Sequence, residues 1–228
     1  DTLSLHDALP ILALVTGASS GIGRAIALIL AREGAKIVAA DLNRDGGEET
    51  AKQVRDQGGE AVCILSDVTR PEESESLVTQ IIQRYARLDI AVNNAGIGGL
   101  TLPTAEYPVD EWRQVIETNL SGVFYGMKAQ IAAMLSTGGG AIVNIASILG
   151  AVGFAAAPAY TAAKHGVVGL TRTSALEYAS QGVRINAVGP AFIHTPMIRK
   201  FEDDEASRAM MVAAHPIGRI GRPEEVAE

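Results

Sequence analysis

"TGASSGIG", residues 16–23, is the most informative stretch of this chain, because it joins a short apolar run to a helical pattern. The run at 13–16 predicts a buried strand, and the apolar spacing of 21–35 predicts a helix. The three glycines of the stretch allow a tight turn and a close approach of the backbone to a ligand. The following helix N-terminus offers free N–H groups to a pyrophosphate. A glycine-rich turn without a ligand is the alternative, and the position after a first strand favours the phosphate loop.

The same alternation of strand and helix continues along the chain. Further strand-like runs occupy 36–41, 61–66, 89–94, 141–147 and 183–189, and helical patterns occupy 44–57, 71–85, 110–135 and 160–180. Helices of this length between strands indicate parallel βαβ units, and continuous apolar strands fit a sheet that is covered on both faces. The sequence therefore predicts one α/β domain over 12–228, with a doubly wound parallel sheet (Rossmann fold).

The bulk composition argues against several classes of protein. The chain has 228 residues, a formal net charge of −7 and no cluster of Lys and Arg, so no nucleic-acid partner is expected. No apolar run approaches the length of a membrane span, so no membrane partner is expected. The single cysteine, Cys63, rules out an internal disulfide and fits a reducing compartment such as the cytoplasm. The four histidines lie far apart in the sequence, so no metal site is expected.

Asp41 ends the second predicted strand. In dinucleotide folds an acidic side chain there accepts hydrogen bonds from the adenosine ribose hydroxyls, and its charge would repel a 2′-phosphate. Asp41 therefore favours NAD. Arg44, three positions on, could assist NADP, which stays the less favoured cofactor. An Asp that only starts a turn is the alternative.

Tyr160 and Lys164 stand four residues apart in the stretch PAYTAAKHG, residues 158–166. On a helix these two positions share one face. The spacing alone is equally consistent with an exposed helical turn that carries two unrelated polar side chains. Their meaning depends on the rest of the chain.

Seven pieces of sequence together resemble the short-chain dehydrogenase/reductase family, in that family's order and spacing, over residues 12–228. The pieces are TGASSGIG (16–23), DV (67–68), NNAG (93–96), Asn119, NIAS ending at Ser147, YTAAK (160–164) and NAVGPAFIHTPM (186–197). The resemblance implies an oxidoreductase that transfers a hydride between NAD(H) and a secondary alcohol or ketone.

The resemblance also implies four catalytic residues, Asn119, Ser147, Tyr160 and Lys164. Tyr160 would be the general acid and base, and Ser147 would hydrogen-bond the substrate oxygen. We expect the Lys164 ammonium and the nicotinamide to lower the Tyr160 pKa from about 10, so that the phenol can exchange a proton near neutral pH. Lys164 would also hold the nicotinamide ribose, and Asn119 would fix a helix distortion and a water of the proton relay.

A larger set of residues is implied for the cofactor. Asp67 and Val68 would hold the adenine edge, the alternative for Asp67 being a turn or cap. Asn93 and Gly96 would form the floor under the adenine ribose, and Thr195 would bond the carboxamide and cap a helix that begins at Pro196. The full set is Gly17, Ser19, Ser20, Gly21, Ile22, Gly23, Asp41, Asp67, Val68, Asn94, Ala95, Gly96, Tyr160, Lys164, Pro190, Ile193 and Thr195. The sequence departs from the family pattern at one position of this region: Ala191 follows Pro190 where the family usually has glycine.

The substrate region is expected after the fifth strand and in a lid at 191–215. Its expected residues are Ser147, Ile148, Leu149, Val152, Phe154 and Phe192. They are mostly apolar, which favours a small neutral alcohol or ketone, cyclic ones included. Three alternatives stay open, namely a 3-oxoacyl-thioester reductase using NADP(H), a non-catalytic dinucleotide-sensing protein and a sugar epimerase. The family resemblance further implies a homotetramer or homodimer formed through helices 110–135 and 160–180.

Both ends of the chain carry an expectation of their own. Residues 2–11 read TLSLHDALPI, the in-frame translation of a common sequencing adaptor, so 1–11 is expected to be non-native rather than a natural arm. The chain stops inside a helix opened by Pro223. Resembling sequences continue through that helix into one further strand, so we expect that last strand to be missing by truncation. The sixth strand would then be a sheet edge, which would lower stability.

Overall fold

The computed structural model describes residues 11–228, so the adaptor-like segment lies outside the described residues except for Ile11. Six strands form one sheet in the order β3-β2-β1-β4-β5-β6, and every neighbouring pair is parallel. The strands are β1 (Leu12–Thr16), β2 (Lys36–Asp41), β3 (Ala61–Leu65), β4 (Ile90–Asn93), β5 (Gly140–Ile145) and β6 (Val183–Val188). The predicted doubly wound parallel sheet is confirmed.

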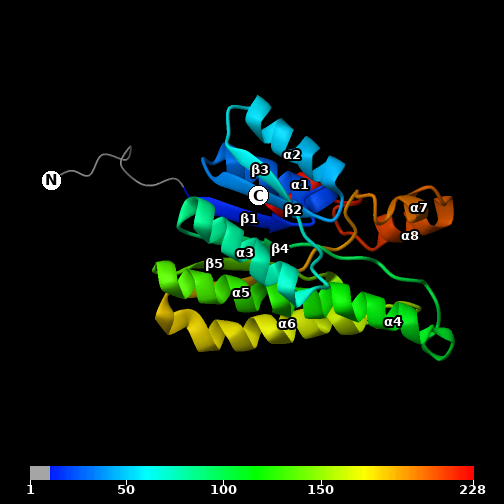
Figure 1. Ribbon diagram of the computed structural model, residues 1–228. Helices are drawn as coiled ribbons and strands as arrows, with labels where there is room; N and C mark the ends of the chain where they lie inside the picture. The colour runs from blue at the N-terminus through cyan, green and yellow to red at the C-terminus, as the bar shows by residue number, and fades with distance from the viewer. Residues whose placement is uncertain (1–10) are drawn as a thin grey trace.

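Helices cover both faces of this sheet (Figure 1). On one face lie α1 (Gly21–Arg32), α2 (Arg44–Asp56) and α9 (Pro223–Ala227); on the other lie α3 (Pro71–Tyr85), α5 (Gly122–Thr137) and α6 (Pro158–Tyr178). Alternate strand residues serve the two layers, because Leu12 and Leu14 pack with α3, α5 and α6 while Ala13 and Val15 pack with α1 and α2. This two-sided burial explains why the strands read as continuous apolar runs.

The helix predicted over 110–135 is two helices joined by a π-helical turn. They are α4 (Val109–Ile116), the turn η2 (Glu117–Ser121) and α5. Asn119 in the turn is fully buried, and its amide exchanges two hydrogen bonds with the backbone of Ile97, at 2.8 and 2.7 Å. The expected helix distortion at Asn119 is therefore present, and its cause is this pair of bonds to a distant loop.

A second difference concerns the segment after β6. No helix begins at Pro196; residues 195–198 form a turn, and α7 (Arg199–Glu202) starts with Ile198 at its N-cap position. The predicted capping role of Thr195 is wrong for this reason. The segment continues as α8 (Glu205–Ala213), which projects with α7 from one end of the sheet (Figure 1). Short 3-10 turns η1 (Thr104–Glu106), η3 (Ile148–Gly150) and η4 (Ala179–Gln181) complete the elements.

Four buried polar side chains form a connected chain under the α5 and α6 side of the sheet. Asn93 on β4 donates to Gln130 at 3.0 Å and to Asn144 on β5 at 2.9 Å, and Gln130 donates back to Asn93 at 2.8 Å. Asn144 donates to Thr171 of α6 at 2.9 Å. Gly126 leaves space for this cluster, since a Cβ at that position would lie 3.0 Å from the Asn93 side-chain oxygen. Each buried amide thus has partners, which offsets the cost of removing it from water.

β6 has one strand neighbour, β5, among residues 11–228. Val183 and Ile185 of β6 are buried against the α5 and α6 layer, whereas Val188 is 39% exposed.

No helix of the described part of the chain combines the length and the apolar character that crossing a bilayer requires.

Candidate active site

The predicted phosphate loop lies between the end of β1 and the start of α1. Gly17 and Gly21 have φ values of 64° and 53°, the left-handed region that favours glycine. A Cβ at Gly17 would lie 2.8 Å from Ala95 Cα, and one at Gly23 would collide with the Gly17 carbonyl oxygen. Ser20 makes no side-chain cap bond to α1, so the first-turn N–H groups keep the anion-binding character of a helix N-terminus.

Two residues that the sequence analysis did not single out brace this loop. The Thr16 hydroxyl oxygen accepts from the backbone N–H groups of Asn94 at 3.1 Å and Ala95 at 3.2 Å. The Asn94 amide in turn donates to the carbonyls of Thr16 and Gly17, at 3.0 and 3.1 Å. Arg24 donates to the Ser19 carbonyl and, at 2.9 Å, to the Thr50 hydroxyl. Only the position of Thr16 at the end of β1 could have indicated its role.

Asp41 lies beside the phosphate loop, at the carboxyl end of β2. Its Oδ2 accepts from the Ser19 N–H and its Oδ1 from the Asn43 N–H, each at 2.8 Å. The carboxylate therefore both caps a turn and faces the loop. Arg44 is exposed at the start of α2.

Asp67 and Val68 lie in the turn after β3. The Asp67 carboxylate accepts from the Thr69 N–H at 2.9 Å and the Thr69 hydroxyl at 2.7 Å, so Asp67 does act as a turn residue. Val68 packs closely on α5, because a Cβ at Gly122 would lie 3.0 Å from the Val68 carbonyl oxygen. Gly96 approaches the buried Asn119, whose Oδ1 would lie 3.1 Å from a Cβ there. These turns thus lie against the π-helical turn and α5.

The segment after β6 crosses over to the phosphate loop. The Pro190 carbonyl accepts from the Ile148 N–H at 2.8 Å, which joins the ends of β5 and β6. Ile193 forms an isolated bridge with Gly221. Thr195 then reaches the loop, since its methyl carbon would lie 3.1 Å from a Cβ at Gly21. The structure thus brings Thr195, in the segment after β6, against the glycine loop at the start of α1.

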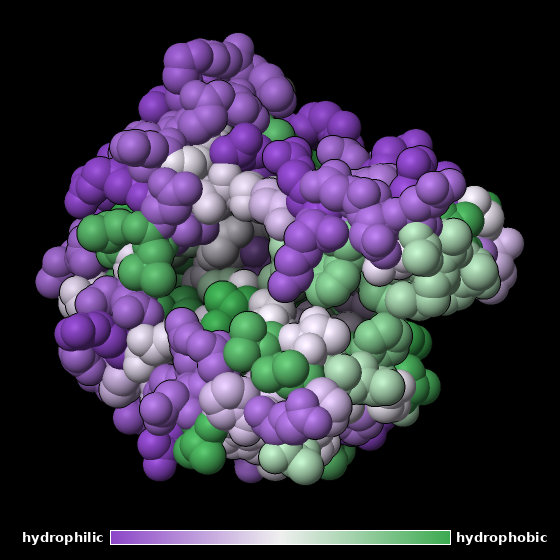
Figure 2. Space-filling view, turned by 90° about the vertical axis from the view of Figure 1, so that its right-hand side faces the viewer, coloured by the Kyte–Doolittle hydropathy of each residue, from purple (hydrophilic) through white to green (hydrophobic). Residues whose placement is uncertain are grey.

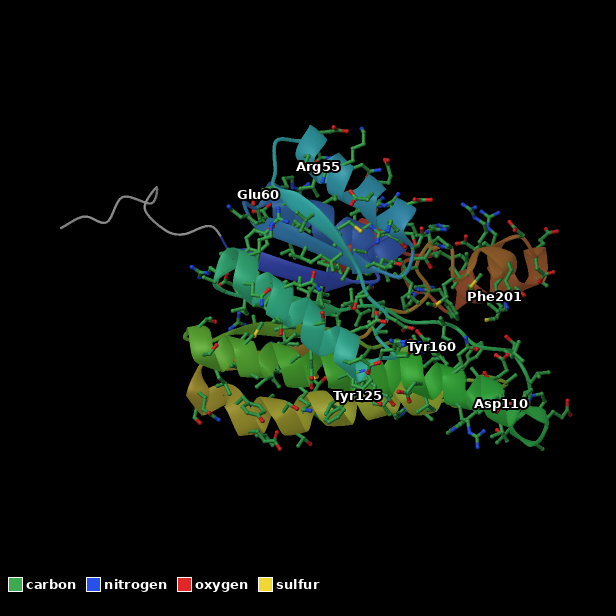
Figure 3. All side chains as sticks on the ribbon, in the orientation of Figure 1. Arg55, Glu60, Asp110, Tyr125, Tyr160 and Phe201 are labelled. Carbon is green, nitrogen blue, oxygen red and sulfur yellow. The ribbon has the colours of Figure 1, made fainter. Side chains whose placement is uncertain are left out.

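Tyr160 and Lys164 lie on the first turns of α6, and Tyr160 faces the end of the sheet that carries α7 and α8 (Figure 3). Lys164 is 4% exposed, and its Nζ donates to the Ile145 carbonyl at 2.7 Å. The same Nζ is 5.5 Å from the centre of the Tyr160 ring. Ser147 lies two residues after β5, at the N-cap position of η3, and its Oγ accepts from the Leu149 N–H at 3.2 Å. These three side chains therefore meet where β5 and α6 converge.

Burial dominates the electrostatics of Tyr160 and Lys164 in the protein without cofactor. Burial raises the pKa of Tyr160, and a hydrogen bond with Ser147 opposes that effect. Burial also lowers the pKa of Lys164 from 10.5 to about 8. The net direction of the Tyr160 pKa in the protein without cofactor is therefore upward, because burial dominates. The expectation that the Lys164 ammonium and the nicotinamide together lower this pKa concerns the complex with cofactor and stays a prediction.

The expected substrate residues lie around the same end of the sheet. Phe154 and Phe192 form an edge-to-face pair, with ring centres 6.2 Å apart and planes at 72°. Ile148, Val152 and Phe154 are exposed apolar side chains, whereas Leu149 is half-buried. Figure 2 shows this face with a hollow near its centre, hydrophilic residues above the hollow and hydrophobic residues below it. The arrangement gives one polar and one apolar wall.

Comparison with known proteins relates this geometry to a family. The profile of the short chain dehydrogenase family matches residues 12–206. Cyclohexanol dehydrogenase of Acinetobacter sp. (strain SE19) is 45% identical over 216 residues, which cover 95% of this chain and 84% of that protein. Cis-4-hydroxycyclohexanecarboxylate dehydrogenase of Sinomonas cyclohexanicum is 45% identical over 216 residues, covering 95% and 86%.

A solved structure shares both fold and sequence. The crystal structure of a single-substitution variant of actinorhodin polyketide ketoreductase with NADPH superposes with a TM-score of 0.89. It is 42% identical, and the match covers 96% of this chain and 87% of the ketoreductase chain.

Proposed function

The chain belongs to the short-chain dehydrogenase family, and we propose that it oxidises an apolar cyclic secondary alcohol to the ketone with NAD, or catalyses the reverse reduction. It is an oxidoreductase of CH–OH donors that uses NAD(P). One observation carries the finer proposal. Ser147, Tyr160 and Lys164 converge at the same end of the sheet as the glycine loop and an apolar wall.

The loop fits a dinucleotide. Gly17 and Gly23 leave space that a Cβ would fill, and the uncapped N-terminus of α1 adjoins it. When bound, the cofactor supplies the hydride acceptor for the alcohol carbon. Residues of the loop, with Asp67, Val68, Asn94 and the segment 190–195, would hold it.

The chain's own residues move the proton. We assign Tyr160 as the group that takes the alcohol proton at the substrate oxygen, and Ser147 as the hydrogen-bond partner of that oxygen. Lys164 would hold the nicotinamide ribose and supply positive charge near the phenol. Burial raises the Tyr160 pKa and so disfavours the phenolate, which is the form that accepts a proton. Positive charge added near the phenol when the complex forms would have to offset this effect.

Asp41 supports NAD as the preferred cofactor. Its carboxylate lies beside the loop, fixed by two backbone N–H groups, where a 2′-phosphate would meet a negative charge. The relative that carries NADPH keeps NADP as the alternative cofactor. A 3-oxoacyl-thioester reductase using NADP(H) is the corresponding alternative function.

Exposed apolar side chains support the proposed dimer or tetramer. Trp112 of α4 is 39% exposed, Phe124 of α5 48% and Leu176 of α6 86%. Contacts between copies through these helices would remove that area from water. Light scattering on purified protein tests this assembly.

The single cysteine supports a cytoplasmic location.

The proposed activity is tested by following NADH absorbance with a panel of alcohols. We expect cyclohexanol and substituted cyclohexanols to be oxidised with higher kcat/KM than 2-propanol or straight-chain 3-hydroxyacyl thioesters. NAD and NADP are compared for each alcohol. A preference for the thioesters with NADPH would overturn the proposal in favour of the alternative function.

A further inference from the structure

His215 lies just after α8, at the end of the segment expected to act as a lid, and was not among the predicted site residues. Its ring lies edge-to-face against Phe192, with ring centres 5.8 Å apart and planes at 61°. Phe192 in turn forms its edge-to-face pair with Phe154. Three aromatic rings therefore run in sequence from the loop after β5, through the loop after β6, to the end of α8.

The two ring nitrogens of His215 have different partners, which defines its hydrogen-bonding state. Nδ1 lies 2.7 Å from the Met211 carbonyl oxygen, and that oxygen only accepts. Nε2 lies 3.3 Å from the backbone nitrogen of Phe192, whose N–H only donates. Nδ1 therefore carries the hydrogen and Nε2 accepts, so this pair of contacts requires the neutral Nδ1–H tautomer.

Phe192 is held at both of its backbone polar groups. Its N–H donates to His215, and its carbonyl accepts from the Gly221 N–H at 3.0 Å. Met211, the other partner of His215, is 1% exposed and therefore a fixed point of α8. His215 thus links a buried turn of α8 to the backbone and the ring of Phe192.

We propose that His215 is a positioning residue for substrate specificity: it fixes the Phe192 ring against Phe154, so that the pair forms a rigid apolar wall for the ring of a cyclic alcohol. This inference rests on the proposed function. Phe154 belongs to the segment that joins Ser147 to Tyr160 and is 42% exposed, so the wall has a free surface on this segment. A small acyclic alcohol would make little contact with it.

The test compares KM and kcat for cyclohexanol and 2-propanol in wild type, His215→Ala and His215→Gln. We expect His215→Ala to raise the KM for cyclohexanol about five- to tenfold, the magnitude of one lost aromatic contact, with a smaller change in kcat and in both constants for 2-propanol. A Gln side chain carries a donating NH2 group and an accepting carbonyl oxygen, so His215→Gln should recover part of the loss. Arg208→Ala, an exposed change on α8, is the matched control.

Equal changes for both alcohols in His215→Ala would overturn the proposal. If His215→Ala does not fold, Phe192→Leu provides the test, because it removes the ring but keeps the backbone hydrogen bond to His215. An unchanged KM for cyclohexanol in Phe192→Leu would contradict the proposal. Nitrogen-15 spectra of the wild-type imidazole provide a readout independent of turnover. They should show the Nδ1–H tautomer, and an Nε2–H tautomer would overturn the proposal. A wild type that shows this tautomer but oxidises no alcohol would instead contradict the proposed function.

Discussion

The backbone N–H of Ser19 donates a 2.8 Å hydrogen bond to Oδ2 of Asp41, which ties the phosphate loop to the end of β2. The second oxygen of the same carboxylate accepts from Asn43 at 2.8 Å. The charge of Asp41 is therefore held in one place beside the loop, and cofactor choice should depend on it.

Replacing Asp41 with Ser should reduce the preference for NAD over NADP. We expect the wild type to favour NAD at least about tenfold in kcat/KM, equivalent to about 1.4 kcal/mol, and the variant to lose most of that ratio. Steady-state kinetics with both cofactors measure it. Asp45→Asn is the control, because it removes the same charge from an exposed position at the start of α2. A wild type that already prefers NADP would contradict the role of Asp41.

Tyr160→Phe should abolish turnover and leave cofactor binding intact. The substitution removes the proton-transferring hydroxyl, a loss of about 10²–10⁴ in kcat, while the ring still fills its place. Stopped assays give kcat, and fluorescence titration with NADH gives Kd. Tyr178→Phe near the end of the same helix should behave as wild type. Near-normal turnover in Tyr160→Phe would refute the assignment.

Lys164→Met should change the pH dependence of stability. Burial lowers the Lys164 pKa from 10.5 to about 8. Below pH 8 both folded and unfolded chains carry the ammonium, so the full burial cost of about 3 kcal/mol is present. Between pH 8 and pH 10.5 only the unfolded chain keeps the proton, so wild-type stability rises with pH, and above pH 10.5 the cost is gone.

The measurement is denaturant unfolding of wild type and Lys164→Met across this range. The advantage of the Met variant in unfolding free energy should shrink by about 2–3 kcal/mol between about pH 7 and about pH 10. The lost hydrogen bond to Ile145 adds an offset of about 1 kcal/mol that does not vary with pH. Turnover should be lost at every pH. A difference that stays constant with pH would show that the Lys164 pKa is not lowered.

Gly23→Ala should disrupt the phosphate loop. The added methyl group would collide with the Gly17 carbonyl oxygen, and the Asn94 amide lies close to the same point. We expect NADH binding to weaken at least about tenfold and the melting temperature to fall. Gly169→Ala on α6 is the control, since a Cβ there meets nothing within 4 Å and should slightly stabilise the helix. Unaltered NADH affinity in Gly23→Ala would exclude this loop as the cofactor site.

The strands could be predicted from the sequence because a strand that is buried on both faces requires a continuous run of apolar residues. The strand predicted at 36–41 matches β2, and the others differ by one or two residues at their ends. The glycine loop could be located in the sequence because its conformation depends on the backbone freedom of its own glycines. Both predictions depend only on residues that are close together in the sequence.

The features that the sequence does not predict depend on contacts between distant segments. The family resemblance predicts the distortion at Asn119 but not its cause, the bonds between Asn119 and Ile97, and the brace at Thr16 arises from β4 lying beside β1. The direction of the Tyr160 pKa follows from burial, which tertiary packing sets. Residue type and spacing carry none of these.

The buried chain of amides beneath the sheet also makes strand misalignment costly. Asn93 and Asn144 are direct neighbours in the pairing of β4 with β5. A slip of β5 by one residue would turn Asn144 toward the apolar layer of α1 and α2 and leave its partners without hydrogen bonds, at about 1–3 kcal/mol for each orphaned group. Apolar side chains alone would tolerate such a slip far better. The buried amides therefore favour the native register of β4 and β5 over a shifted one.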